Sequence, residues 1–183
     1  SNEFQGLDTL PEVVNSARTL AAAGSGDDLY AFPADLTDAF YRYRITEDLW
    51  TPLADAPDPG VGRGASLVHT GGDHIYATRG NYSGDFWRYT ISGNSWEDSS
   101  AIAPLPDLMG MDGQLIWDGG DLIYCLPGGN YENNTSFLTF YRYSIAGANA
   151  LGQAGNTWQS LATPPDYVMQ GNAMVYPGTG DAI

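Results

Sequence analysis

The sequence predicts an all-β fold assembled from repeated four-stranded units, as in propellers and solenoids. One pattern occurs three times: Gly-Asp before a short apolar run ending in Tyr, then an aromatic-rich segment centred on Arg, then Trp. The first two copies are in step, since Tyr30 and Tyr76 are 46 residues apart, as are Trp50 and Trp96. A period of about 20–50 residues is typical of units that bury their apolar faces only by stacking on one another. The copies comprise 26–30, 40–43 and Trp50; 72–76, 86–89 and Trp96; and 120–124, 140–143 and Trp158.

The middle copy indicates how each unit divides into strands. Residues 64–69 are small and apolar, as expected of a first strand, and the Gly-rich segment 70–73 supplies the positive φ that a tight hairpin turn needs. Residues 74–78 follow as the second strand, and a polar loop leads to residues 86–90, which alternate as a third strand should. A short turn leads into a fourth strand that contains Trp96, and Pro residues end the unit.

We expect a single repeat region with three complete units and two partial ones. Phe4 precedes Pro11 by the same interval that separates Trp50 from Pro57, so the chain is expected to open in the last strand of a preceding unit. Three complete units cannot close a propeller, which typically has about 4–8 blades, so the sequence favours a fragment of a longer chain. The predicted boundaries within 1–183 are 1–14 for the preceding strand, 15–60, 61–108 and 109–168 for the complete units, and 169–183 for the start of a further unit.

The third copy fits the pattern once an eight-residue insertion, 148–155, is removed from between its third and fourth strands. The inserted residues are small and uncharged. This composition predicts a flexible loop rather than a functional one.

Composition narrows the classes of partner. There are 22 acidic residues against 7 basic ones, all of them Arg, and the net charge is −15. Such a surface repels nucleic acid and anionic lipid, and no apolar run approaches the ~20 residues that span a bilayer, so we expect neither nucleic-acid binding nor membrane insertion. The single cysteine, Cys125, excludes an internal disulfide and a multi-Cys metal site, and its strand-like context predicts a buried thiol.

The repeat resembles the kelch motif, which combines a diglycine near the second strand, an aromatic pair in the third, and a Trp seven residues later. Here Tyr124 is followed by Gly128 and Gly129, and Phe-Trp-Arg-Tyr at 86–89 leads to Trp96, whereas the first copy has Phe32-Pro33 where the diglycine belongs. The resemblance implies a kelch-like β-propeller, here a fragment, of four-stranded antiparallel blades. In that family the first strands line a central channel. The loops between second and third strands share one face with the blade-to-blade loops, and that face commonly binds partners.

Several residues that could carry chemistry have simpler interpretations. His69 and His74 flank a hairpin turn, but two imidazoles alone leave a zinc or copper site short of ligands, so we expect incidental strand histidines. Tyr124 and Cys125 are consecutive in a strand and point to opposite faces, which excludes the Tyr–Cys crosslink of kelch-like copper radical oxidases between these two residues.

Two residue types recur in every copy. The Asp that follows Gly in each first turn, at 27, 73, 121 and 181, is expected to be hairpin chemistry rather than a calcium site. Arg42, Arg88 and Arg142 are identical across the units, which favours a repeated ion pair or aromatic stack between blades over contact with a ligand.

The loops between second and third strands differ among the copies, which makes them candidate binding sites. Exposed Tyr with Asn and acidic neighbours suits ring stacking on a sugar, hydrogen bonds to hydroxyl groups, or a protein interface. The candidates for contact with a glycan or protein partner are Tyr82, Asp85, Tyr131, Glu132, Asn133 and Tyr167. The N-x-Ser/Thr pattern also predicts glycosylation at Asn81, Asn133 and Asn134 if the protein is secreted.

The sequence therefore predicts a non-enzymatic recognition module, extracellular or on a cell surface, that binds a glycan or protein through its loop face and needs no cofactor or metal. Two alternatives stay open. The chain could be a structural subunit whose assembly is completed by strand pairing between subunits, because unpaired strand edges recruit partners. It could also belong to a propeller enzyme whose catalytic residues lie elsewhere, since no catalytic Ser/His/Asp, Cys/His or phosphate-loop arrangement occurs here.

Overall fold

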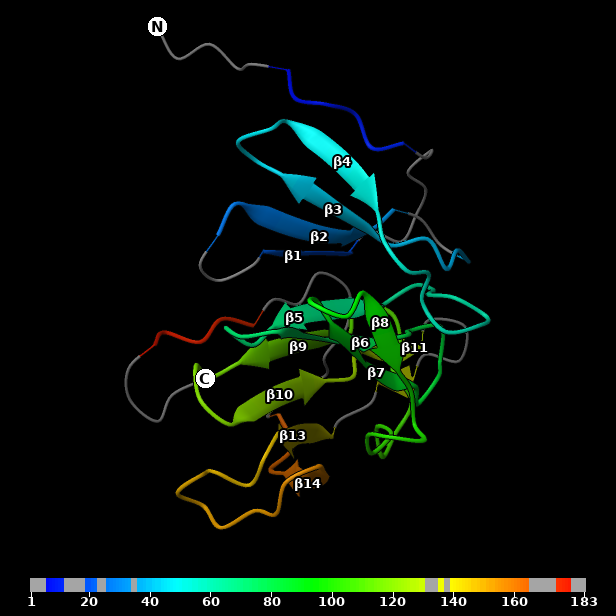
Figure 1. The fold of residues 1–183 in the computed structure, drawn as a ribbon. Coiled ribbons are helices and arrows are strands. Elements are labelled where there is room, and N and C mark those ends of the chain that lie inside the picture. The colour runs from blue at the N-terminus through cyan, green and yellow to red at the C-terminus, as the bar shows by residue number, and fades with distance from the viewer. Residues whose placement is uncertain are drawn as a thin grey trace, which may run out of the picture.

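The structure is a computed structural model, and it describes residues 6–11, 19–22, 26–33, 36–130, 135–136, 139–164 and 174–178. The regular structure in these ranges is all β, arranged as three four-stranded antiparallel sheets and one small hairpin (Figure 1). None of the described residues forms a helix long and apolar enough to cross a membrane. The all-β prediction is confirmed.

Each sheet is a meander in which strands pair in chain order. Sheet one contains β1 (Thr19–Ala22), β2 (Asp28–Phe32), β3 (Tyr41–Arg44) and β4 (Leu49–Pro52). Sheet two contains β5 (Ser66–His69), β6 (His74–Thr78), β7 (Phe86–Thr90) and β8 (Ser95–Glu97). Sheet three contains β9 (Gln114–Trp117), β10 (Leu122–Leu126), β13 (Phe140–Ser144) and β14 (Thr157–Leu161). The small hairpin of β11 (Gly129–Asn130) and β12 (Thr135–Ser136) lies between β10 and β13 in the chain.

The sheets follow one another through the molecule in chain order, as the colours of Figure 1 show. The first strand of sheet two, β5, contacts both β1 and β9, so the first strands of the three units lie next to one another. The fourth strands lie at the other edge of each sheet, because each meander runs from its first strand to its fourth.

Aromatic side chains fill the space between consecutive sheets in a repeated arrangement. Phe40 of sheet one meets Tyr89 of sheet two edge-on, with ring centroids 5.0 Å apart and an interplanar angle of 73°. Phe86 of sheet two meets Tyr143 of sheet three at 5.0 Å and 70°. Edge-to-face packing of this kind adds to the stabilisation that comes from removing the rings from water. The repeated aromatic residues of the sequence are therefore the core between the sheets.

A hydrogen-bonded junction also repeats between units. Asn94, at the turn between β7 and β8, accepts hydrogen bonds through Oδ1 from the Tyr89 hydroxyl at 2.7 Å and from the Ala54 backbone N–H at 2.8 Å. Ala54 belongs to the segment that leaves sheet one. Asn156 repeats the arrangement with Tyr143 and Ala103, and Asp48 repeats it with Tyr43 and Asp8. Residues 6–11 therefore meet sheet one as the segments after β4 and β8 meet sheets two and three.

The recurring Asp residues have a structural role, as predicted. They stabilise the turn between the third and fourth strands rather than the hairpin turn in which they lie. Asp73 accepts hydrogen bonds from the backbone N–H of Ser92 at 2.8 Å and from its hydroxyl at 2.5 Å. These bonds join the β7–β8 turn to the β5–β6 turn. Asp27 holds Thr46 in the same way in sheet one. Asp181 lies outside the described residues.

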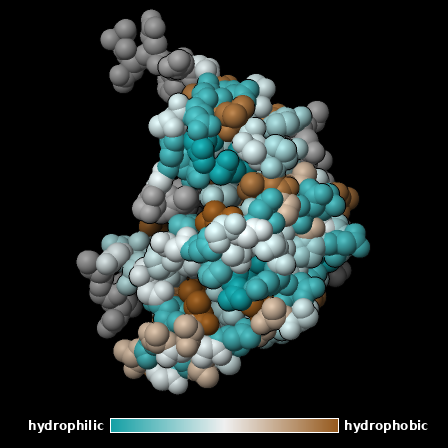
Figure 2. Space-filling view, in the orientation of Figure 1, coloured by the Kyte–Doolittle hydropathy of each residue, from teal (hydrophilic) through white to brown (hydrophobic). Residues whose placement is uncertain are grey.

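The surface carries no broad apolar area on the side drawn in Figure 2, where hydrophobic residues occur in small, separate groups among hydrophilic ones. Elsewhere in the described part of the chain, exposed large hydrophobic residues occur at several loops and strand ends, such as Leu49, Leu151 and Val175.

Candidate functional site

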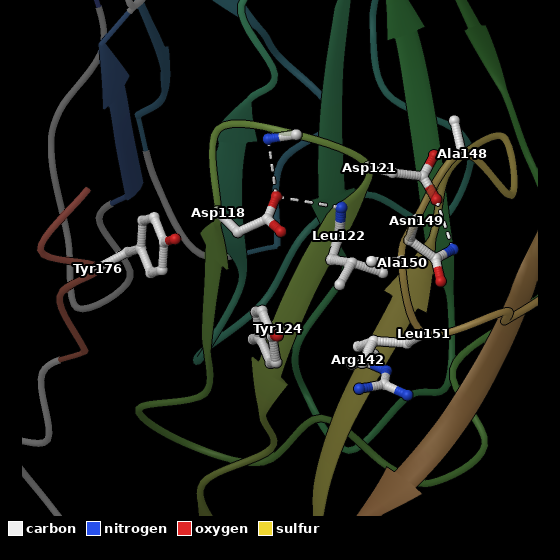
Figure 3. Close-up of a pocket in the computed structure, with 11 residues that line it drawn as sticks. Asp118, Asp121, Leu122, Tyr124, Arg142, Ala148, Asn149, Ala150, Leu151 and Tyr176 are labelled. Carbon is white, nitrogen blue, oxygen red and sulfur yellow. Dashed lines mark hydrogen bonds between the residues drawn. The ribbon is translucent and has the colours of Figure 1, made fainter. Parts of the chain in front are cut away.

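A recess of about 490 Å³ lies at one end of sheet three (Figure 3). One wall is the turn between β9 and β10, with Asp118. A second is the sheet itself, with Tyr124 of β10 and Arg142 of β13. The inserted loop supplies Leu151, and Tyr176 stands on the opposite side. The recess therefore combines two carboxylates, those of Asp118 and Asp121, with a guanidinium, two tyrosines and apolar side chains.

The position of Tyr176 follows from a contact of its own segment with sheet three. The backbone N–H of Met174 donates a hydrogen bond to Gln114 Oε1 of β9 at 2.7 Å. A comparable bond joins the first strands of sheets two and three, where the Leu115 N–H donates to Ser66 Oγ at 3.0 Å. Residues 174–178 thus lie beside β9 where the next first strand is expected from the repeat.

The inserted loop is fastened to the sheet by a polar network. Asp121 accepts hydrogen bonds from the Ser144 hydroxyl at 2.6 Å, the Ala146 N–H at 2.7 Å and the Asn149 side-chain amide at 2.9 Å. Burial acts to raise the pKa of Asp121, but these hydrogen bonds outweigh it and hold the pKa below its ordinary value. The Gln153 backbone N–H in turn donates to Asn149 at 3.1 Å. The insertion, predicted to be a flexible rather than a functional loop, forms a hydrogen-bonded wall of the recess.

The recurring Arg differs between sheets in what neutralises it. Arg88 pairs with Glu97, its cross-strand neighbour on β8, with Nε to Oε2 at 2.6 Å. Arg42 lies 3.9 Å from Asp28 of β2. Both pairs lie within one sheet, so the predicted ion pair between blades is wrong for them. Arg142 instead donates to two neutral amide oxygens, Gln153 Oε1 at 2.7 Å and Gln159 Oε1 at 2.6 Å.

Tyr124 stands at the centre of the recess wall. Its ring stacks on Phe140 with centroids 5.7 Å apart. Burial raises the pKa of the Tyr124 hydroxyl, the Asp118 carboxylate raises it further, and Arg142 opposes both effects. Asp118 itself is oriented by the backbone N–H groups of Gly120 and Leu122, which donate to Oδ1 at 2.8 and 3.1 Å.

The predicted loop candidates lie at the other end of the sheets. Tyr82 has φ +56° and is half-buried, so it is less exposed than predicted, and its hydroxyl oxygen is buried with no hydrogen-bond partner among the described residues. Asp85 accepts hydrogen bonds from Ser83 Oγ at 2.6 Å and from Arg79 Nη1 at 3.4 Å. Asn81 is exposed. Tyr131, Glu132, Asn133, Asn134 and Tyr167 lie outside the described residues.

These loops contact the connections between sheets through backbone hydrogen bonds. The Tyr82 N–H donates to Met109 O at 2.9 Å, and the Met109 N–H donates to Ser83 O at 2.8 Å. Thr37 and Val61 form the same kind of bridge between sheets one and two. The loops and connections therefore share one end of the molecule, as the resemblance implies, and part of their polar backbone is already bonded.

The remaining candidates for chemistry serve the fold. His69 Nε2 bonds to Gly72 O at 2.9 Å, and His74 Nδ1 lies 3.4 Å from Thr90 Oγ1. Cys125 is fully buried in the core between sheets two and three, where burial raises the pKa of its thiol, while Tyr124 points to the opposite face. Across the described ranges, no three His, Cys, Asp or Glu side chains are grouped so that they could hold a metal ion.

Comparison with known proteins gives a likeness of fold. No protein-family model matches the chain, and neither does any curated protein. Among solved structures, the chain is similar to one described as the structure of YjhT, with a TM-score of 0.65 and 16% sequence identity. The match covers 88% of this chain and 55% of that chain, so this chain spans about half the length of YjhT. At this identity the likeness establishes a shared all-β fold and nothing about activity.

Proposed function

We propose that the chain is part of a kelch-like β-propeller and acts as a non-enzymatic recognition module, outside the cell or on its surface. The propeller assignment is supported by three four-stranded meanders with adjacent first strands and by the repeated aromatic contacts between sheets. The likeness to YjhT over 88% of the chain is consistent with it. In this proposal the sheets are a scaffold, and recognition takes place where the units differ.

The observation that carries the proposal is the recess on sheet three. One wall of the recess is the inserted loop, which sheets one and two lack. Another wall is formed by β10 and β13, which belong to a hydrogen-bonded sheet rather than to an isolated loop. Ligand sites in proteins are typically concave, with apolar walls and a few fixed polar groups. Tyr124 and Tyr176 can stack on a sugar ring or an apolar side chain, and Asp118 and Arg142 can form hydrogen bonds. A glycan or a segment of a protein therefore fits the recess chemically.

The test uses two matched surface substitutions and an unbiased search for ligands. The protein is screened on a glycan array and against a peptide library, and each ligand found is then titrated into Leu151→Arg and Leu49→Arg. Leu151 lines the recess and is 58% exposed, whereas Leu49 on sheet one is 48% exposed. We expect Leu151→Arg to abolish binding and Leu49→Arg to leave it unchanged. Equal binding by both variants would place the site elsewhere, and a screen without ligands would reject the recognition role.

A structural role in assembly is the second candidate, and one observation favours it. The stacked pair Tyr76–Phe86 of sheet two is covered by Tyr143 and Trp158 of sheet three. Tyr124–Phe140 of sheet three has the same geometry, 5.7 Å and 21°, but no ring from another sheet packs on it within the described part of the chain. If this face joins subunits, the sedimentation coefficient will rise with protein concentration, and Phe140→Ser will abolish the rise. A concentration-independent coefficient would reject the role.

A further inference from the structure

The charge of Arg142 has no counterpart in its own sheet. In sheet two the counterpart is Glu97, and in sheet one an acid also lies nearby, Asp28, which is 3.9 Å from Arg42 and accepts a hydrogen bond from Arg44. By the repeat, Gln159 stands at the position of Glu97, and Leu122 stands at the position of Asp28. Within the part of the chain that the structure describes, no carboxylate lies within 4.0 Å of the Arg142 guanidinium. Sheet three therefore keeps the Arg and has neither of the acids that lie beside it in the other two sheets.

The two glutamines orient the guanidinium without cancelling its charge. Gln153 and Gln159 accept through neutral amide oxygens at 2.7 and 2.6 Å, which fixes the plane of the Arg142 side chain. A planar guanidinium held in this way is well suited to bind a carboxylate, because a charge-assisted hydrogen bond is stronger than a neutral one. Arg142 is half-buried at the wall of the recess, where screening by water is weaker than at an open surface.

The other residues that line the recess limit which chemical groups the ligand can have beside its carboxylate. Leu122, Tyr124, Leu151 and Tyr176 present apolar surface. Two carboxylates also line the recess: Asp118 at the β9–β10 turn, and Asp121, which accepts a hydrogen bond from Asn149 of the inserted loop. A second acidic group of the ligand near either carboxylate would be repelled. The walls thus favour a ligand with one acid group, next to an apolar or aromatic part that lies against the tyrosines.

We propose that the recess binds an organic monocarboxylate whose acid group pairs with Arg142 and whose neighbouring apolar group packs on Tyr124 and Tyr176. This chemistry occurs both in free aryl or alkyl acids and at the C-terminal residue of a peptide. The inference rests on the proposed function, because it takes the recess to be the binding site. It adds the ligand class and the residue that selects it. The net charge of −15 opposes anions at long range, but at physiological ionic strength that field is screened within about 8 Å, so Arg142 acts locally.

The first experiment compares phenylacetate with phenylacetamide, which has nearly the same shape and no charge, by calorimetric titration of the intact protein at physiological salt. We expect phenylacetate to bind at least about tenfold more tightly, because only the acid can form charge-assisted hydrogen bonds with Arg142. Equal affinity for the two compounds, or no binding of either, would overturn the proposal.

Two further variants separate charge pairing from damage to the fold. Gln159→Glu restores the acid that sheet two has at this position, so it is expected to neutralise Arg142, keep the urea midpoint, and weaken phenylacetate binding about tenfold or more. Ser160→Glu adds the same charge at the next exposed residue, on the opposite face of β14, and is expected to change the affinity less than about twofold. If Gln159→Glu binds phenylacetate as well as the natural chain, the proposal is wrong.

A peptide ending in Phe, in free-acid and C-terminally amidated forms, distinguishes the two sources. Binding of the acid form at least about tenfold more tightly than phenylacetate, and loss on amidation, would identify a peptide C-terminus. Affinity equal to or weaker than that of phenylacetate would identify a free acid as the source. If Leu151→Arg abolishes binding of a ligand from the array or library, and Gln159→Glu leaves that binding unchanged, the recess is still the recognition site and the carboxylate preference is wrong.

Discussion

The indole N–H of Trp96 donates a hydrogen bond to the backbone carbonyl oxygen of Ala54 at 3.0 Å, and this bond ties sheet two to the segment that leaves sheet one. Trp158 makes the same bond to Ala103 at 3.0 Å. Trp96→Phe keeps most of the ring but removes the donor, so we expect it to lower the free energy of unfolding by about 0.5–1.5 kcal/mol. Urea denaturation followed by circular dichroism measures the change.

Trp117→Phe is the control for that substitution. The Trp117 indole donates to Gly120 O at 2.8 Å within its own hairpin, in an exposed position where water can replace the bond. We expect a smaller loss of stability. A larger loss for Trp117→Phe than for Trp96→Phe would mean that the Trp96 bond does not help to hold the sheets together.

Acid should weaken the junction at Asp48 more than the equivalent junctions at Asn94 and Asn156. Hydrogen bonds from the Asp8 backbone and from Tyr43 lower the pKa of Asp48 in the folded protein. A carboxyl group with a lowered folded pKa adds stability above its unfolded pKa, and that stability is lost as the pH falls through the folded pKa. Between pH 7 and pH 3, Asp48→Asn should therefore lose less stability than the natural chain. Urea midpoints at the two pH values measure this difference.

The same comparison has an internal control. Asn at position 48 can accept both hydrogen bonds, as Asn94 does, so stability at pH 7 should stay close to that of the natural chain. Asp55→Asn removes the same charge from another exposed position and serves as the control for the change in net charge. An unchanged acid dependence in Asp48→Asn would show that this junction is not sensitive to protonation of Asp48.

The cores between sheets should depend strongly on Phe86 and much less on Phe140. Phe86 is fully buried and contacts Tyr76, Tyr143 and Trp158. Truncation of such a ring creates a cavity, so Phe86→Ala is expected to cost about 3–5 kcal/mol of unfolding free energy. Phe140 is half-buried with one ring neighbour, and Phe140→Ala should cost less than half as much. Similar losses in guanidinium unfolding would contradict the described packing.

Cys125 should be unreactive until the core between sheets two and three opens. The side chain is fully buried, and burial raises the pKa of its thiol, which suppresses the nucleophilic thiolate. Because it is the single cysteine, the absorbance released from a disulfide reagent such as DTNB reports this residue alone. Labelling is expected to be slow in buffer and fast in denaturing urea. Fast labelling in buffer would show that the core opens readily.

Much of the fold could be predicted because the repeat aligns side chains that have the same environment. The second and third strands of sheet two were predicted at 74–78 and 86–90, the bounds of β6 and β7. In β7 burial alternates from Trp87 onward, with Tyr89 buried and Arg88 half-buried, whereas β6 is buried on both faces from Ile75 to Thr78. Tyr30 and Phe40 of sheet one and Tyr76 and Phe86 of sheet two are buried at equivalent positions, so these copies support one another, whereas Tyr124 and Phe140 of sheet three are half-buried.

The candidate site could not be predicted, because it depends on contacts between residues far apart in the chain. Arg142 is identical to Arg88 in sequence, but its surroundings differ, because Gln159 replaces Glu97 across the strand pair and because Gln153 of the insertion accepts a hydrogen bond from Arg142. Asp73 accepts a hydrogen bond from Ser92, 19 residues later in the chain, rather than from a residue of its own turn. The positive φ of Tyr82 and the burial of its hydroxyl leave no sign in the sequence.

The junction formed by Asn94, Tyr89 and Ala54 bears on how such a protein can change over evolutionary time. Asn156, Tyr143 and Ala103 form an equivalent junction, with the same atoms donating and accepting. A segment such as 61–108 contains both an Asn–Tyr pair and the backbone N–H that the next unit's Asn binds. Duplication of this segment would therefore add a unit with a complete junction on each side, and deletion would leave two neighbouring units that can still form the junction. The number of units can change by unequal exchange within the gene, while each unit remains able to acquire its own insertion, as the third has done at 148–155.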